Sequence, residues 1–569
     1  MDNKKVDKLG DVVHKEDRFS SSSQEDLSLQ PYGPPGFRGI AASRYVAVCA
    51  SFSAVGGLLF GYEYAILPRS TPAHHGVISV TLTMDQFLDR FHEVADGSSG
   101  SGFYKGLMTA MITLGAFIGA LNQGWIADVF SRKYSIMVAV VVFIVGSVLQ
   151  TAAIDYAMLI VGRLIGGIGI GMLSMVVPLY ISEISPPEIR GTLLVLEELS
   201  IVIGIVVAFW ITYGTQYIDG THWSWQLPFV IQIIPGVFLG LGATFLPFSP
   251  RWLASKGRDD EALKNLAKFR QLPETDSRVR REWLEIISES RFQKQVLSER
   301  HPDLVKPGTS NAIKLEFVAW TDCVKKGCWR RTHVGAGIMF FQQRCHQFVG
   351  INALIYYSPT LFGTMGLGHN MQLIMSGVLN MTQLIGVASS LWTMDRFGRR
   401  NLLMLGSVLM CISHVIIAIL VGLFSENWPA HQAQGWTSVA FLLFYMLAFG
   451  ASWGPIPWAM PSEIFPSSLR AKGVAISTCS NWLNNFIIGL ITPPLVQSTG
   501  FGAYVFFASF CLLSLVWTFF FVPETNGKTL EEMDNVFKDR DSTGELVTKQ
   551  RIFEETRTEK FQSRRSEEA

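Results

Sequence analysis

Apolar residues along this chain form long, nearly unbroken stretches instead of alternating with polar ones. A helix needs about 20 apolar residues to cross the hydrocarbon core of a bilayer. Twelve stretches approach or exceed that length. We therefore predict an all-α membrane protein with spans at roughly 44–67, 103–126, 135–154, 159–182, 190–213, 225–246, 331–363, 371–393, 401–424, 436–460, 470–493 and 503–522.

Charged sequence divides these spans into two sets of six. The charged stretch between the sets contains two amphipathic patterns, DDEALKNLAKFRQL and SRVRREWLEIISESRFQKQV. The predicted organisation is an N-terminal tail (1–43), a first half (44–246), a linker (247–330), a second half (331–522) and a C-terminal tail (523–569).

Basic residues in the short loops predict the orientation, because cytoplasmic loops are enriched in Lys and Arg. Arg132, Lys133, Arg190, Arg399 and Arg470 all fall on one side of the predicted spans, whereas the opposite loops are mainly acidic. We expect both termini to be cytosolic and the protein to reside in the plasma membrane.

Composition supports this class. Hydrophobic residues make up 49% of the chain and charged residues 16%, against about 25% charged in soluble domains. A formal net charge of +1 argues against nucleic acid as a partner. The seven Cys have no metal-ligand spacing, and no phosphate-binding loop or nucleophile constellation is present. We expect no metal, no cofactor and no enzymatic activity.

The two halves repeat each other in sequence. GWIADVFSRK (124–133) recurs as WTMDRFGRR (392–400), SEISPPEIRG (182–191) as SEIFPSSLRAKG (462–473), and PFSPRW (247–252) is echoed by VPET (522–525). The first two repeats are offset by 267 to 280 residues. Internal repeats with a binding site between them are typical of secondary transporters.

Together with GRLIGGIGIGM, GINALIYYSP, GPIPWAMPSEIFP and VPETNGKT, these repeats resemble the sugar porter branch of the major facilitator superfamily over about residues 44–540. Fungal hexose transporters are most similar. The resemblance implies two pseudo-symmetric six-helix halves that carry a hexose such as glucose by alternating access. A proton symporter, a facilitative carrier and a sensor with little flux all remain open. The implied partners are a monosaccharide, a proton and membrane lipid.

The repeated charges are candidates for a conformational latch, because Arg–carboxylate pairs depend strongly on geometry and can be broken and remade. Loop charges that only set the topology are the alternative. The set comprises Asp128, Arg132, Lys133, Glu183, Arg190, Asp395, Arg399, Arg400, Glu463 and Arg470. Ser131 stands where the second repeat has Gly398, which predicts a weaker tight turn in the first half.

Amides and aromatic rings in the predicted spans are candidates for sugar binding, because a sugar presents hydroxyls around apolar faces. Hydrogen bonds that only join helices are the alternative. The candidates are Gln342, Gln343, Gln347, Asn352, Tyr357, Trp458, Asn481, Asn485, Gln383 and Glu198. The resemblance implies that Trp458 and Asn481 contact the sugar. For Tyr357 and its neighbour Tyr356, gating or packing is an equal alternative.

Two of these positions depart from the family pattern. Glu198 replaces a sugar-binding Gln, and a carboxylate accepts hydrogen bonds but donates only when protonated. A residue reaching the cytosolic end of its span is the alternative for Glu198. Gln383 replaces a sugar-facing Asn, with Asn380 as the alternative for that role.

The seventh span contains an extra segment of four residues, RCHQ (344–347) or QRCH (343–346). Four residues rotate a helix by about 400°, so Gln343 and Gln347 share a face but differ in depth. Relative to Asn352, the spacing in relatives favours Gln347 as the sugar contact and makes Gln342 and Gln343 the alternates. Arg344 needs Glu198, another acid or water as a partner.

Glu63, an acid within the first span, is a functional candidate by default. Proton-coupled relatives pair an acid at this position with the Arg of GRL, here Arg163. A static ion pair is the alternative. Residues 64–75, YAILPRSTPAHH, interrupt the pattern of the family. They predict either a loop near the external mouth or an error in the gene model or splicing.

Overall fold

The computed structural model describes residues 32–34, 37–65, 84–95, 100–186, 188–218, 220–300, 320–325, 328–342, 365–465, 469–499, 501–525 and 547–560, together with Pro302, Lys314, Val318, 362–363 and 536–537. Every element described is helical. The inserted segment (64–75) falls outside the description from residue 66, and the 344–347 insertion lies entirely outside it.

The first half comprises α2 (Phe37–Ala42), α3 (Arg44–Ser53), α4 (Val55–Ala65), α5 (Asp85–Arg90), the 3-10 turn η2 (His92–Val94), α6 (Ser101–Phe130), α7 (Arg132–Thr151), α8 (Tyr156–Ile184), α9 (Arg190–Thr215), α10 (Trp223–Ile231) and α11 (Ile233–Ala243). The linker forms α12 (Pro250–Ser255), α13 (Asp259–Arg270) and α14 (Ser277–Arg300). The second half comprises α16 (Trp329–Phe340), α18 (His369–Phe397), α19 (Arg399–Phe424), the turn η4 (Trp428–Ala430), α20 (Gln432–Ala451), α21 (Ile456–Ile464), α22 (Arg470–Thr499) and α23 (Gly502–Phe521).

Ten helical segments in the described part of the chain are long and apolar enough to span a membrane. They correspond to ten of the predicted spans. The predicted span 470–493 lies within α22, which is 30 residues long. The predicted span 331–363 is described only to residue 342 and again at 362–363, and its first part forms α16.

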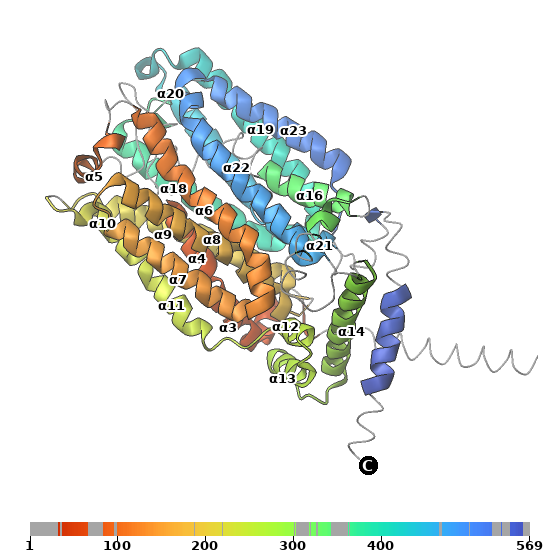
Figure 1. Ribbon diagram of the computed structural model, residues 1–569. Helices are drawn as coiled ribbons and strands as arrows, with labels where there is room; N and C mark the ends of the chain where they lie inside the picture. Colours follow the sequence, from red (N-terminus) through yellow and green to blue (C-terminus); the bar gives the residue numbers. More distant parts are fainter. Residues whose placement is uncertain are drawn as a thin grey trace, which may run out of the picture.

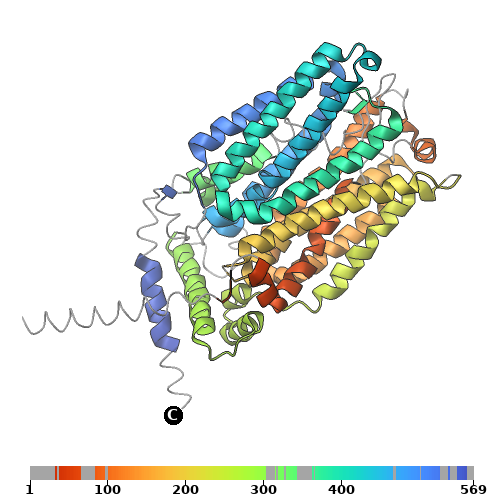
Figure 2. The same cartoon turned by 180° about the vertical axis from the view of Figure 1, so that it is seen from behind.

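The two halves stand beside each other as helical bundles (Figures 1 and 2). In the first, α8 packs closely against both α6 and α7. Glycines of the GRLIGGIGIGM motif allow this contact, because a Cβ on Gly171 would lie 2.0 Å from the Ala116 carbonyl oxygen. Two long helix pairs, α6 with α22 and α9 with α18, join the halves.

Three of the spans are interrupted. The first breaks at Ala54 between α3 and α4, and the sixth at Gln232 between α10 and α11. The tenth breaks between α20 and α21, where Pro455 precedes the first residue of α21. Backbone groups released at such a break need new hydrogen-bond partners in a membrane.

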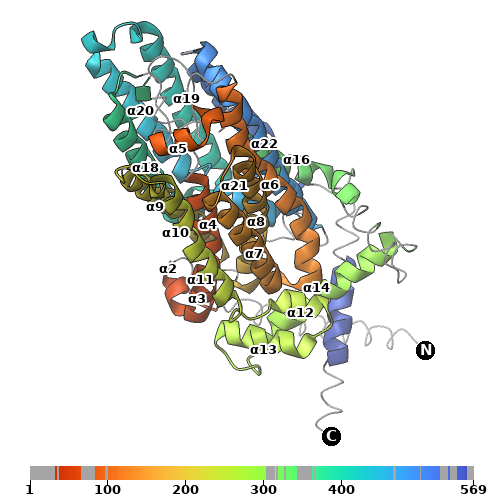
Figure 3. The same ribbon diagram turned by 60° about the vertical axis from the view of Figure 1, so that its left-hand side comes forward.

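The linker helices α12, α13 and α14 gather at one end of the bundles, which we call the α14 end (Figures 1 and 3). Arg270 of α13 anchors them: its guanidinium donates to Glu282 of α14, at 2.8 Å from Nε, and to the Ile184 carbonyl of α8, also at 2.8 Å. It also lies over the Tyr32 ring. Arg270 therefore ties the linker to the first bundle.

A C-terminal helix, residues 547–560, lies along α14 (Figure 1). Ile552 packs against Phe292 and Val296 in a small buried cluster. Ion pairs flank this contact: Lys549–Glu289 at 2.8 Å, Lys560–Asp259 at 2.9 Å and Arg291–Glu559. The C-terminal helix is thus joined to α14 by a central apolar contact and two ion pairs, and Lys560 also pairs it with Asp259 of α13.

Candidate functional site

A buried carboxylate marks the first candidate site. Glu63 lies near the C-terminal end of α4 and is only 1% exposed. Gln150 of α7 donates from Nε2 to its Oε1 at 3.0 Å. Arg163 of α8, also buried, interacts electrostatically with the same carboxylate. Gly166 leaves room for this arrangement, since a Cβ there would lie 3.0 Å from Gln150 Nε2.

The carboxylate is less than fully bonded. Gln232, at the break between α10 and α11, lies beside it, but neither Gln232 Nε2 nor Glu63 Oε2 has a hydrogen-bond partner among the described residues. Phe229 covers Arg163 at 5.8 Å from its ring centre. A buried polar atom without a partner is costly and calls for a functional explanation. A free carboxylate oxygen is where a proton can bind.

Buried amides form the second candidate site. Gln342, at the end of the described part of the seventh span, donates both N–H bonds of Nε2 to the carbonyls of Trp453 and Gly454, at 3.1 and 3.0 Å. Its Oε1 accepts from Asn481 Nδ2 at 3.0 Å. Asn485 Nδ2 in turn donates to Asn481 Oδ1 at 3.3 Å.

This chain of amides repairs the break between α20 and α21, because the carbonyls that Gln342 satisfies are those of the interrupted turn. The donors of Gln342 are therefore already occupied by protein. In this conformation Gln342 holds the broken helix and Asn481, and its role as a sugar contact stays a prediction.

A narrow cavity of about 10 Å³ lies between the halves. The first half contributes Phe60, Ser174, Glu197 and Glu198, and the second half contributes Trp458. Both glutamates are buried, and neither is bonded to another described residue. The cavity thus combines an aromatic face with two carboxyl groups.

Trp482 closes one side of this region. Its Nε1 donates to Ser174 Oγ at 3.1 Å, and its ring meets that of Phe60 edge-on at 5.1 Å. These contacts join α22 of the second half to α8 and α4 of the first. Helices from both halves therefore meet at the cavity.

Two further amides lie on α18. Gln383 and Asn380 are both buried, and neither Gln383 Oε1 nor Asn380 Oδ1 has a hydrogen-bond partner in the described part of the chain. Gln383 and Asn380, the two candidates for the sugar-facing position of the eighth span, therefore both have an acceptor oxygen without a partner among the described residues.

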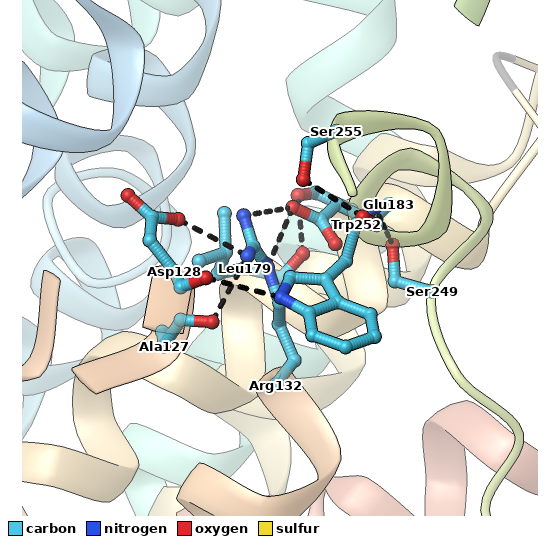
Figure 4. A network of polar contacts seen from close by, with 9 residues as sticks. Ala127, Asp128, Arg132, Leu179, Glu183, Ser249, Trp252 and Ser255 are labelled. Carbon is cyan, nitrogen blue, oxygen red and sulfur yellow. Dashed lines mark hydrogen bonds and ion pairs between the residues drawn. The ribbon is translucent and has the colours of Figure 1, made fainter. Parts of the chain in front are cut away.

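The latch charges of the first half meet at the α14 end (Figure 4). Arg132 pairs with Glu183 at 2.9 Å and with Asp128 at 3.1 Å, and it donates to the Ala127 carbonyl at 3.1 Å. Trp252 of α12 donates to the Asp128 carbonyl at 3.2 Å. This cluster links α6, α7, α8 and the linker.

The second half builds a counterpart. Arg399 pairs with Glu463 at 3.5 Å, and Thr525 donates to the other Glu463 oxygen at 2.7 Å. The backbone N–H groups of Arg399 and Arg400 donate to Glu524 at 2.9 and 3.1 Å. The Arg132–Glu183 and Arg399–Glu463 pairs thus each join helices within one half.

The remaining latch residues lie near these clusters. Lys133 donates to the Thr244 carbonyl at 2.6 Å, and Arg470 donates weakly to the Phe465 carbonyl at 3.5 Å. Arg190 is half-buried at the start of α9. The adjacent Gly191 approaches the Arg399 guanidinium, which lies 3.9 Å from the position of a Cβ there. The start of α9 in the first half therefore approaches the Arg399 cluster of the second half.

Several candidates lie outside the described residues. These are Gln343, Gln347, Asn352, Tyr356 and Tyr357, together with the side chain of Asp395. The predicted register of the seventh span stays a prediction.

Comparison with known proteins identifies the family. Residues 49–537 match the family model described as "Sugar (and other) transporter". This chain belongs to the sugar transporter family. With its fold, this membership places it in the major facilitator superfamily.

Curated members of the sugar transporter family differ in what their names say they carry. The chain is 35% identical to a probable quinate permease of Aspergillus flavus, over 81% of this chain and 84% of that protein. It is 31% identical to a high-affinity glucose transporter of Kluyveromyces lactis, over 87% and 85% respectively.

Solved structures of a sugar transporter share the fold. The proton:xylose symporter XylE bound to 6-bromo-6-deoxy-D-glucose aligns with a TM-score of 0.68 at 25% identity, covering 87% of this chain and 99% of that one. A partially occluded, inward-open form of XylE from E. coli aligns with a TM-score of 0.65 at 24% identity, covering 86% and 100%.

Three polar residues at these sites escaped the sequence interpretation. Gln150 and Gln232 carry no motif, although each is an uncharged polar residue within a predicted span, which is a usable signal. Glu197 was missed because only its neighbour Glu198 occupies a position of the family pattern. Adjacent helical positions diverge by about 100°, so Glu198 gave no indication of Glu197. The structure has both lining the cavity.

Proposed function

We propose that this protein transports a neutral monosaccharide, a hexose such as glucose, by alternating access. We further propose that a proton moves with the sugar through Glu63, which Arg163 and Gln150 hold. The free Glu63 oxygen in a buried polar site is the observation that supports coupling most directly. The proton symporter XylE and the yeast glucose transporter support the assignment.

The cavity between the halves is the proposed sugar site, and it has to widen from about 10 Å³ in this conformation to admit a hexose. The ring of Trp458 offers an apolar face, and Glu198 and Glu197 offer hydroxyl acceptors. Further proposed contacts are Asn481 and Asn485 of the amide chain, Gln383 on α18, whose Oε1 is a free acceptor in the described part of the chain, and Gln342, Gln343, Gln347, Asn352 and Tyr357. We also propose that the protein resides in the plasma membrane, with the α14 end and both termini in the cytosol. The charged clusters at the α14 end would then act as a latch on the cytosolic side.

Quinate is the second candidate substrate, because several relatives are named probable quinate permeases. Quinate carries a carboxylate. Two unpaired carboxyl groups line the cavity, and no cationic residue is among its described lining residues. The carboxylate of quinate would therefore be buried there without a cationic partner, which is costly, so a neutral polyol is favoured over an anion.

Uptake of radiolabelled glucose and quinate by a host lacking its own hexose carriers tests the substrate. Glucose is expected to enter and quinate to enter poorly. The double variant Glu197→Gln/Glu198→Gln should raise the ratio of quinate to glucose uptake. Preferential quinate uptake by the unaltered protein would refute the hexose proposal, and saturable glucose binding without entry would favour a sensor.

Coupling is tested in the same host by measuring glucose accumulation at acidic and alkaline external pH, with and without an uncoupler. Glu63→Gln should abolish accumulation against a gradient while leaving equilibrative entry. The matched control is Glu426→Gln, which alters an exposed acid after α19. Accumulation that ignores the uncoupler would make the protein a facilitative carrier.

A further inference from the structure

A second cavity lies away from the proposed transport path, at the α14 end of the second half. It measures about 660 Å³. It sits where α16 begins at Trp329 and α23 ends at Phe521, so its position is the boundary where two membrane helices leave the bilayer. Its volume lies within the range of small-molecule sites, about 300–1,000 Å³.

Aromatic side chains form its walls. The His333 ring packs 5.0 Å from Phe521 and 6.2 Å from Trp329, measured between ring centres. The outer rings are exposed: Trp329 by 50%, Phe520 by 71% and Phe521 by 52%. Aromatic residues at the end of a span lie at the level of lipid headgroups, so this rim faces lipid.

A basic side chain lines the same cavity. Arg330 lines the cavity and is exposed. Within the described residues its guanidinium makes one long polar contact, from Nη1 to the Phe537 carbonyl at 3.5 Å, and no carboxylate there pairs with it. Its neighbour Arg331 is different, because it is buried, donates to the Ile464 carbonyl at 2.8 Å and covers the Phe537 ring. Arg331 is structural, whereas the charge of Arg330 is available to a ligand.

We propose that this cavity binds an anionic glycerophospholipid from the leaflet at the α14 end. The phosphate would bind Arg330 beside His333, and an acyl chain would lie along Trp329, Phe520 and Phe521. Basic pockets between membrane helices are suited to anionic headgroups. A soluble phosphate would use the charge but not the exposed apolar rim, and therefore the combination favours a lipid.

The proposal is tested on the full-length protein in nanodiscs that contain phosphatidylserine or phosphatidylcholine, with lipid retention after detergent extraction measured by native mass spectrometry. Phosphatidylserine should be retained preferentially. Arg330→Ala should reduce its retention about fivefold, since one basic residue near the surface is worth about 1 kcal/mol. Arg396→Ala, an exposed Arg on α18, is the matched control and should have no effect.

Trp329→Ala should weaken retention of both lipids, because it removes acyl contact without changing charge. Equal retention of both lipids by the unaltered protein would overturn the proposal, as would equal losses from Arg330→Ala and Arg396→Ala. Displacement of phosphatidylserine by millimolar inorganic phosphate would point to a soluble anion instead and would also overturn it. Glucose uptake by each variant verifies that it folds.

Discussion

At the residue scale, the two repeats place different residues at the same position of a tight turn. Ser131 and Gly398 each sit between two membrane helices with nearly equal backbone angles, φ 87° and 83°. That region suits glycine and strains other residues by about 1–3 kcal/mol. The turn at Ser131 is therefore formed but strained, which agrees with the prediction of a weaker turn. A hydrogen bond that Ser131 Oγ accepts from the Tyr134 N–H at 3.3 Å offsets part of this strain.

Ser131→Gly should stabilise the protein by about 1 kcal/mol, because the strain relieved exceeds the modest cap that is lost. The measurement is thermal unfolding of the detergent-purified protein. Gly398→Ser is the reciprocal change and should be destabilising, since Glu524 Oε2 lies 2.5 Å from where its Cβ would be. A lower unfolding temperature for Ser131→Gly would contradict this account of the turn.

At the element scale, the break between α20 and α21 depends on a side chain from another helix. Gln342→Leu removes the donor to two buried carbonyls, and each unsatisfied group costs about 1–3 kcal/mol. We expect a marked fall in unfolding temperature and loss of glucose uptake. Gln432→Leu, at an exposed position at the start of α20, is the control. Normal stability of Gln342→Leu would mean that water or another residue satisfies those carbonyls.

The linker module has its own acid sensitivity. Burial raises the pKa of Glu282, but hydrogen bonding and charge from Arg270 outweigh it, so the pKa of this carboxyl lies below 4.5. A depressed pKa means that the pair stabilises the fold above about pH 4.5 and that this stability is lost as the pH falls through the folded-state value.

Limited proteolysis of α12–α14 should therefore accelerate below about pH 4.5. Glu282→Gln should remove that dependence and leave cleavage fast at every pH, because breaking a buried pair costs roughly 3–5 kcal/mol. Glu285→Gln, at an exposed position paired with Arg281, is the control and should cleave like the unaltered protein. A proteolysis rate independent of pH would show that the pair does not hold the module.

At the scale of the whole molecule, the seam between the halves limits motion. Near the end opposite α14, a Cβ on Gly377 of α18 would lie 2.5 Å from the Trp210 ring of α9. Gly377→Leu should force the halves apart there by roughly 1–3 kcal/mol of overpacking. Because uptake requires this end to close, we expect it to fall about tenfold.

Gly214→Leu is the matched control on α9, since nothing lies within 4 Å of a Cβ at that position. Labelling of a single engineered cysteine near Trp210 should increase in Gly377→Leu and stay unchanged in Gly214→Leu. Equal uptake by both variants would mean that this contact does not limit the cycle.

Much of this architecture was predictable, for physical reasons. Membrane spans require long apolar runs, so ten of them and α22 were found where the hydropathy places them. Side-chain partners were less accessible. The spacing of Asn481 and Asn485 predicts a shared face, but the bond from Asn481 to Gln342 crosses 139 positions, and no local pattern encodes it. Glu63 was found because charge is rare in a membrane, whereas Gln150 was missed because an uncharged amide outside any motif is a weaker signal.

The helix at 547–560 also places a constraint on synthesis. It covers Phe292 and Val296 of α14, so a nascent chain carries this apolar pair uncovered while the whole second half is made. At roughly 5–20 residues per second, the roughly 250 residues up to Ile552 take on the order of 10 to 50 seconds to translate. Only a chain translated past Ile552 can bury the pair in this way, and a chain that stops before it presents the pair to chaperones and proteases.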